Sequence, residues 1–172
     1  MRTTFTQMIA ATALVLAALT TGANAQEIGR IGVDWIGNDI VIDAVQDPKI
    51  EGVTCHIAFF DRSIIDRLQQ GNWFEDPSNS SIDCAQTGAL VIGDIEFGKQ
   101  GEEVFRERRS IILKTLLIKR IYDAENNALV YLAHSRQIQQ GSAKTSISVV
   151  PLAGSDVVWT NGAPQQRVKP VH

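Results

Sequence analysis

Cysteine, histidine and aromatic residues are scarce in this sequence, which limits the chemistry that it can support. The 172 residues include two cysteines and three histidines, and aromatic residues make up 6% of the chain. His56, His134 and His172 lack the i, i+2 or i, i+4 spacing of a local metal-binding pair. We therefore predict no metal site, and we interpret His56 and His134 as ordinary strand side chains rather than as catalysts.

Familiar catalytic and cofactor-binding signatures are also missing. The sequence contains no C-x-x-C redox pair, no G-x-S-x-G nucleophile elbow, no Asx-rich calcium loop and no dinucleotide fingerprint. It shows no strand–helix–strand rhythm, no internal repeat and no coiled-coil heptad. We expect no bound cofactor, and we favour a non-enzymatic function while leaving catalysis open.

Neither sign of charge is in large excess. Sixteen Lys and Arg residues stand against 19 Asp and Glu residues, for a net charge of −3. This balance argues against a general nucleic-acid-binding protein, which would be basic. Acidic residues gather between positions 34 and 84, whereas basic residues, among them Arg106, Arg108 and Arg120, gather between 99 and 120. Either neighbouring strands complement each other, or a basic strip binds an anionic ligand or a lipid headgroup.

No apolar run in the sequence is long enough to span a bilayer, and the run near the N-terminus has the features of a secretory signal. Arg2 precedes an apolar stretch at residues 8–19, and Ala23-Asn24-Ala25 is a small-x-small cleavage site. This stretch is shorter than the about 20 residues that span a bilayer. We predict a secretory signal at residues 1–25 that is cleaved after Ala25, a periplasmic location, and no transmembrane segment in the mature chain from Gln26 onward.

Cys55 and Cys84 are the two cysteines. In an oxidising compartment an even count suggests a disulfide, and two cysteines allow one intramolecular pairing. The alternatives are a redox-active pair or a metal site, but the C-x-x-C spacing and the further ligands that these need are missing. We predict a structural disulfide, which would stabilise the fold by roughly 3–4 kcal/mol in the chain-entropy model.

Two apolar runs around a short polar linker dominate the second half of the chain. The first run covers residues 111–122 and the second covers residues 128–135, with the linker DAENN at 123–127. Such a pattern, with Asp and Asn at the linker, is typical of a β-hairpin. We expect this hairpin to form the centre of an antiparallel sheet.

Shorter strand patterns surround the hairpin. In the strand predicted at 53–60, Val53, Cys55 and Ile57 share one face, which suits a buried disulfide. Asp61 is placed to cap one short helix that ends before Gly71. Further strands are predicted at residues 28–36, 40–45, 82–84, 90–97, 102–108 and 145–151.

About eight short strands and one short helix predict a mainly β domain. We expect an antiparallel sandwich or partly closed barrel, with the helix in the disulfide loop. Trp73 and Phe74 in that loop would fold back onto the core or form an exposed aromatic ligand platform. The predicted organisation is a signal at 1–25, a β-rich domain at 26–152 and an irregular tail at 153–172, where Trp159 is the candidate for docking.

The stretch GSAKTS at residues 141–146 allows three interpretations. Ser142 and Lys144 could form a catalytic serine–lysine pair, with a desolvated lysine as the base. Lys144 with Ser142 and Ser146 could instead hold an anionic group. A polar turn before a strand explains the same residues, and the complete phosphate-loop pattern is not present.

Several sequence blocks, in order, resemble the CreA family of exported bacterial proteins. They are DPKIEGVTCHIAFF, SIDCAQTG, EVFRERRSIILKTLLIKRIYDAENNALVYLAHS and GSAKTSISVVPL, and the resemblance spans residues 27–152. It implies a periplasmic location and a paired-cysteine architecture, but the family name reflects a genetic neighbourhood and implies no reaction or ligand. Ala143 stands where the family pattern has proline, and the family usually has tyrosine at the positions of His56 and His134.

Two classes of function follow from these observations. The first is a non-enzymatic periplasmic binding or envelope-associated protein that uses its sheet faces and the basic strip of Arg106, Arg108 and Arg120. Its partner would be a small anionic ligand or an envelope protein. The second is a periplasmic hydrolase-like enzyme whose site converges on Ser142 and Lys144. We favour the first because the usual catalytic set is missing.

Overall fold

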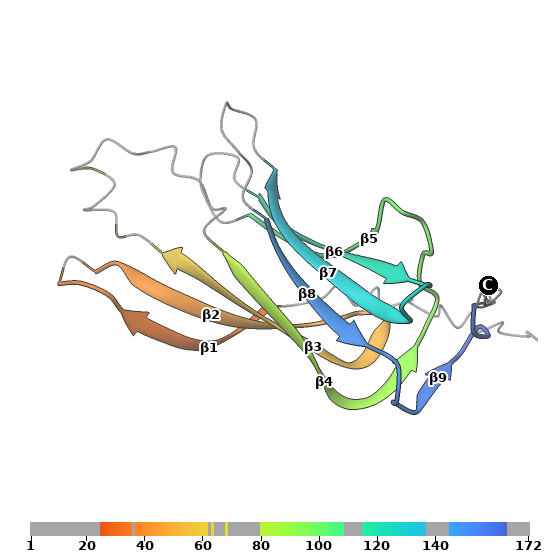
Figure 1. The fold of residues 1–172 in the computed structure, drawn as a ribbon. Coiled ribbons are helices and arrows are strands. Elements are labelled where there is room, and N and C mark those ends of the chain that lie inside the picture. The colour runs from red at the N-terminus through yellow and green to blue at the C-terminus, as the bar shows by residue number, and fades with distance from the viewer. Residues whose placement is uncertain are drawn as a thin grey trace, which may run out of the picture.

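The computed structural model describes residues 25–35, 37–61, 63, 68, 80–108, 115–136 and 145–164. These residues form nine strands in two sheets, shown in Figure 1. Sheet A has the strand order β1-β2-β3-β4-β9, and sheet B has the order β5-β6-β7-β8. The predicted mainly β, sandwich-like architecture is confirmed. Within the described ranges, no helix has the length and hydropathy needed to cross a membrane.

Neighbouring strands are antiparallel except for β4 and β9, which are parallel. The strands of sheet A are β1 (Ala25–Gly32), β2 (Asp39–Gln46), β3 (Ile50–Asp61), β4 (Ser81–Ile92) and β9 (Val157–Trp159). The strands of sheet B are β5 (Glu102–Arg108), β6 (Thr115–Asp123), β7 (Ala128–Arg136) and β8 (Thr145–Pro151).

The hairpin predicted at the centre of a sheet is formed by β6 and β7. Its register pairs Asp123 with Ala128. The Asp123 carboxylate accepts hydrogen bonds from the backbone N–H groups of Glu125 and Asn126, both at 3.1 Å. Asn127 then adopts a left-handed conformation with φ of 48°, which asparagine tolerates better than most residues. Turn chemistry that is readable in the sequence therefore sets the register of sheet B.

The hydrophobic core lies between the two sheets. Alternate residues of each strand point inward, and fully burying a large aliphatic side chain contributes roughly 1.5–3 kcal/mol. Sheet A contributes Val45, Ile50, Val53, Cys55, Ile57, Ile82, Cys84, Leu90 and Ile92, and sheet B contributes Phe105, Leu116, Ile118, Leu129, Tyr131, Ala133 and Val150.

β4 is one continuous strand, whereas the sequence predicts two separate strands at 82–84 and 90–97. Residues 85–89 are all exposed and show no apolar alternation, so pairing with β3 rather than local pattern makes them a strand. β4 passes very close to Gly52 of β3, where the register shifts. A Cβ atom at Gly52 would lie 2.3 Å from the carbonyl oxygen of Ala89, so only glycine fits there.

The two faces of β8 differ in burial, and the face with Ile147 and Val149 is the exposed one. Ser148 and Val150 point inward and are buried, while Ile147 and Val149 are exposed. Ser148 Oγ accepts a hydrogen bond from the Cys84 backbone N–H at 2.8 Å. A serine at this position therefore joins the edge of sheet B to β4 of sheet A.

Two expectations about irregular segments have different outcomes. The helix expected between Asp61 and Gly71 falls largely outside the described residues, and Asp61 itself ends β3. The segment after residue 152, expected to be irregular, contains β9, which pairs with β4 from Leu90 to Ile92. Trp159 packs partly against the core from this strand.

Candidate interaction surface

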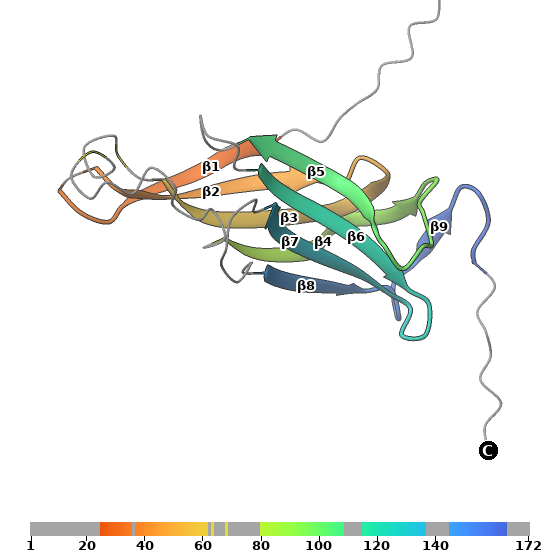
Figure 2. The same ribbon diagram turned by 90° about the horizontal axis from the view of Figure 1, so that it is seen from above.

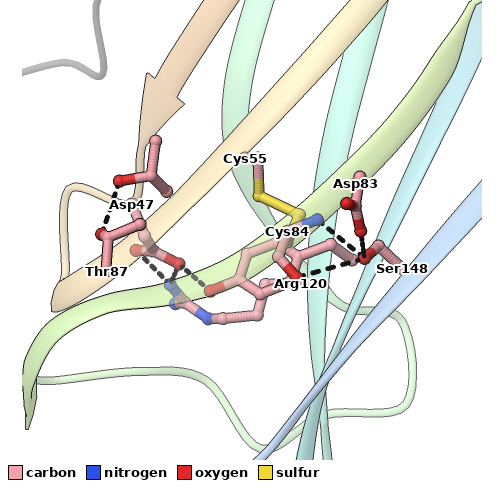
Figure 3. The surroundings of a disulfide bond; sticks show 9 residues. Asp47, Cys55, Asp83, Cys84, Thr87, Arg120 and Ser148 are labelled. Atoms are coloured by element: carbon pink, nitrogen blue, oxygen red, sulfur yellow. Dashed lines mark hydrogen bonds and ion pairs between the residues drawn. A yellow bond between two sulfur atoms is a disulfide. The ribbon is translucent and has the colours of Figure 1, made fainter.

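A buried cluster of charged side chains joins the two sheets, as Figure 3 shows. Arg120 projects from β6 into the core with 1% of its side chain exposed, and its Nη1 donates to both carboxylate oxygens of Asp47, in the turn between β2 and β3. Tyr131 Oη donates to Asp47 Oδ2 at 2.8 Å, and the Lys49 backbone N–H donates to Oδ1 at 2.9 Å. These bonds offset the cost of burying the Asp47 charge.

Glu102 and Lys49 extend this cluster toward the surface. Arg120 Nη2 donates to Glu102 Oε2, which also accepts the Glu96 backbone N–H at 3.1 Å. Lys49 Nζ pairs with Glu102 Oε1. Two cations thus face two carboxylates, Asp47 and Glu102, so the ion cluster is neutral as a whole and holds β2–β3, β5 and β6 together.

The surroundings of the ion cluster shift the pKa values of its members. Burial alone would raise the pKa of Glu102, but the bonds from Lys49 and Glu96 and the charge of Arg120 outweigh it and lower that pKa. Burial acts first on Tyr131, and the adjacent Asp47 adds to it, so the pKa of the phenol rises. Burial would lower the pKa of Arg120, but the charge of Asp47 raises it instead. Arg120 therefore stays charged and Tyr131 stays protonated.

The structure separates the basic residues that the sequence analysis grouped as a strip. Arg120 lies on the inner face of sheet B and pairs with Asp47, which is 73 residues away in the sequence. Arg106 is opposite Leu117 on the outer face, and it donates to both carboxylate oxygens of Glu103 at 2.7 and 2.6 Å. For Arg120, complementarity within the chain is thus the interpretation that the contacts support.

The remaining predicted ligand-binding residues do not form one described site. Ser146 faces inward on β8, where its hydroxyl is buried and has no hydrogen-bond partner among the described residues. Ser142, Lys144 and the side chain of Arg108 lie outside the described residues. Trp73 and Phe74, the candidates for an aromatic platform, lie outside them as well.

His56 and His134 lie on different sheets. His56 is exposed on β3, and His134 is partly buried on β7. Among the described residues, no group of three or more His, Cys, Asp or Glu side chains is placed to hold a metal ion.

The predicted disulfide between Cys55 and Cys84 is present. It joins β3 and β4 at positions directly opposite each other, and Figure 3 shows it next to Ser148. Both cysteines are buried. Burial hinders attack by an external thiolate, so the geometry fits the structural role expected for the pair.

Apolar side chains line part of the outer face of sheet A, the face turned away from sheet B. Ile31 of β1 is opposite Ile40 of β2, which is opposite Phe60 of β3. Directly opposed residues lie within reach of one another on the same face. Ile31 is 56% exposed and Phe60 47% exposed, and Ile40 between them is partly buried. We call Ile31, Ile40 and Phe60 the apolar row.

The apolar row continues toward the connection between β1 and β2. Val33 is about half exposed, and Trp35 is 94% exposed. Asn38 is buried, and its side-chain amide and backbone N–H both donate to the Asp34 carboxylate, at 2.7 and 3.1 Å. Val33, Asp34, Trp35, Gly37 and Asn38 form what we call the β1–β2 tip. In Figure 1 and Figure 2 it lies at the end of the molecule opposite β9.

An ion group lies on the opposite face of the same hairpin. Arg30 donates to Glu27, Asp39 and Asp61 at distances of 3.0–3.1 Å. The bonds to Glu27, then to Asp61 and Asp39, raise the pKa of the Arg30 guanidinium. Three carboxylates share this guanidinium, so the charged residues that the structure describes at this end of sheet A are mostly acidic.

The sequence analysis did not single out the apolar row or Trp35. Residues 28–36 alternate only weakly, and Ile31, Val33 and Trp35 at i, i+2 and i+4 were the available signal. Such alternation normally marks the face that packs on the core. Here the other face of β2 and β3 packs inward, so the alternating residues of β1 remain exposed.

Comparison with known proteins identifies relatives of this chain. A sequence model for the family described as CreA protein matches residues 28–155. The Protein CreA of Escherichia coli strain K12 and that of Escherichia coli O157:H7 are each 41% identical to the chain over 137 residues. The match covers 76% of this chain and 85% of each relative. No solved structure shows a significant match.

Proposed function

The chain belongs to the CreA family, and from that premise we propose that its domain is an exported, non-enzymatic binding module that attaches to a component of the bacterial envelope. It binds through the outer face of sheet A. One observation carries this function: Ile31 and Phe60 are exposed on either side of Ile40 in a cross-strand row, and the row leads to an exposed Trp35. Single exposed apolar residues are common, but contiguous ones mark interaction sites.

The chemistry of β1 favours contact through the sheet face over addition of a strand at the sheet edge. β1 is the edge strand, and its register with β2 shifts between Glu27 and Gly29. A bulge and charged residues such as Glu27 and Arg30 are devices that protect sheet edges against pairing. The apolar row lies on the face, where these devices do not act.

The described charged residues also support a binding role over a catalytic one. Arg120 and Lys49 pair with Asp47 and Glu102 to hold the sheets together, and Arg106 pairs with Glu103 on the surface. These side chains are engaged within the chain. The outer face of sheet A is apolar at the cross-strand row of Ile31, Ile40 and Phe60.

Export is the other half of the proposal. The signal-like residues 1–25 and the disulfide, which persists in oxidising compartments, support it. We expect the full-length chain, expressed with a C-terminal tag, to appear in the periplasmic fraction with Gln26 at its N-terminus by mass spectrometry. A cytoplasmic chain that retains residues 1–25 would contradict export.

Co-sedimentation with envelope membranes from Escherichia coli tests the binding face. We expect the purified, processed protein to bind, and Ile31→Ser to weaken binding about tenfold or more, since burying an isoleucine contributes roughly 1.5–3 kcal/mol. Ile147→Ser on β8 is the matched control, because Ile147 is an isoleucine of similar exposure, 62%, on the other sheet. Equal effects of the two substitutions, or no binding at all, would refute the proposed function.

A further inference from the structure

We propose that the β1–β2 tip seats on a zwitterionic lipid surface, with Trp35 at the boundary between headgroups and hydrocarbon. This inference rests on the proposed function and names the chemistry of its partner. Trp35 is the most exposed of the large apolar side chains described, at 94%, and Ile31 and Val33 behind it are about half exposed. An indole ring is large and apolar with one polar N–H, which suits the membrane–water boundary.

Hydrogen bonds hold the tip in a shape that displays the indole. The buried Asn38 donates twice to Asp34, and its Oδ1 accepts the Ser63 backbone N–H at 3.1 Å. Gly37 has a φ of 88°, a left-handed conformation that glycine adopts without strain. Because the residues on both sides of Trp35 are bonded to one another, little conformational entropy is lost when the ring is buried in a partner.

Charge selects the kind of lipid surface. Among the residues that the structure describes on the inner face of the hairpin, Asp39 and Asp61 carry two negative charges beside the single positive charge of Arg30. An anionic membrane would repel these carboxylates, whereas a zwitterionic membrane, which carries no net charge, would not.

The distance between Trp35 and the carboxylates of the ion group also fits the thickness of a headgroup layer. Asp39 pairs with Gly32, three residues before Trp35. At about 3.3 Å per residue, Asp39 and the Asp61 opposite it stand up to roughly 10 Å behind the indole. Interfacial segments bury their apolar side to about 5–10 Å. Trp35 can therefore reach the acyl boundary while Asp39 and its neighbours stay among the headgroups.

The shape of the molecule permits this approach. The tip projects at one end, away from β9 and from sheet B, as both ribbon views show (Figure 1 and Figure 2). The apolar row lies on one side of the hairpin and the ion group on the other, so a surface that meets the hairpin end-on contacts both.

Flotation with protein-free vesicles tests the inference, using the processed protein purified from the periplasm. With vesicles of phosphatidylethanolamine and phosphatidylcholine we expect binding that Trp35→Ala weakens about tenfold or more and that Trp35→Phe largely retains. Val158→Ala on β9 is the control, since Val158 is 57% exposed at the other end of the molecule, and it should leave binding unchanged. Unchanged melting temperatures would show that the variants are folded.

Two further readouts address depth and charge. Lipids brominated on their acyl chains should quench part of the tryptophan fluorescence of the unmodified protein, and Trp35→Phe should abolish that part. Replacing the zwitterionic lipids with phosphatidylglycerol should weaken binding at low salt, and added salt should reduce the difference because it screens repulsion.

Three outcomes would overturn the inference. They are the absence of binding to protein-free vesicles, equal binding by Trp35→Ala, and stronger binding to phosphatidylglycerol than to zwitterionic lipid. If Ile31→Ser still reduced binding to envelope membranes while protein-free vesicles bound nothing, the proposed function would stand and its partner would be an envelope protein. A second copy of the chain as partner would appear instead as a dimer by light scattering that Trp35→Ala dissociates.

Discussion

Replacing Arg120 by methionine removes one charge from the centre of the ion cluster and keeps a long, unbranched side chain. Asp47, whose side chain is fully buried, would lose the guanidinium that contacts both of its carboxylate oxygens. Glu102 would retain Lys49 as a partner. Removing one member of a buried ion pair costs about 3–5 kcal/mol, because the remaining charge stays desolvated and uncompensated. This is a large part of the about 5–15 kcal/mol by which a typical domain is stable.

Urea-induced unfolding with the disulfide intact, followed by circular dichroism, measures this loss. Arg106→Met is the matched control, because the same substitution there breaks the exposed pair with Glu103 and should leave the unfolding midpoint unchanged. Adding Asp47→Asn to Arg120→Met should restore part of the stability, since the neutral amide leaves no buried charge. The double-mutant cycle then measures the coupling between Arg120 and Asp47.

A small effect would refute this reasoning. If Arg120→Met lowered the free energy of unfolding by less than about 1 kcal/mol, the value typical of exposed pairs, water would have to reach the guanidinium in the folded protein. The same conclusion would follow if Arg120→Met and Arg106→Met behaved alike. In either case Arg120 would again be a candidate for binding an external anion.

Acid, a backbone substitution and loss of the disulfide each probe another part of the sandwich. Because the pKa of Glu102 is lowered below its usual 4.5 in the folded state, ionised Glu102 stabilises the fold above that pH, and this contribution is lost as the pH falls through the lowered value. Glu102→Gln should therefore flatten the decline of the melting temperature below about pH 4.5. Parallel curves of melting temperature against pH for the variant and the parent would contradict this. Gly52→Ala should lower the free energy of unfolding by about 1–3 kcal/mol from its φ of 80° alone, and by more because the added Cβ would collide with β4. Gly29→Ala, where the added Cβ makes only ordinary contacts, should lower it far less. Equal unfolding midpoints for the two variants would argue against the close passage of β4 over Gly52. Cys55→Ala with Cys84→Ala should lower the free energy of unfolding by roughly 3–4 kcal/mol, measured against the oxidised parent, and a loss near zero would show that the bridge constrains little.

Much of the fold could be predicted because local patterns and local turn chemistry agree with it. The β6–β7 hairpin follows from two apolar runs around Asp123 and Asn127, and the inward face of β3 follows from Val53 and Ile57. β4 was divided in two because its exposed middle has no pattern of its own. That strand exists through pairing with β3, and pairing is invisible in a single segment.

The candidate surface was harder to predict than the fold. An alternating apolar pattern predicts which residues lie together on one face of a strand. It does not predict which face another sheet will cover. The same pattern is buried at Val53 and Ile57 and exposed at Ile147 and Val149. The apolar row emerges only when sheet B is seen to cover the other face of sheet A.

The sequence by itself determined the cysteine pair, the central hairpin and the β-rich class, since each depends on residue types that are close in the chain or limited to one pairing. Only the tertiary structure decided that Arg120 is a core residue and that Trp35 is an exposed one. Arg120 pairs with Asp47, which is 73 positions away in the sequence, so no local pattern around Arg120 predicts its burial. The exposure of Trp35 depends equally on where sheet B stops, because burial is a property of what packs against a side chain rather than of the side chain itself.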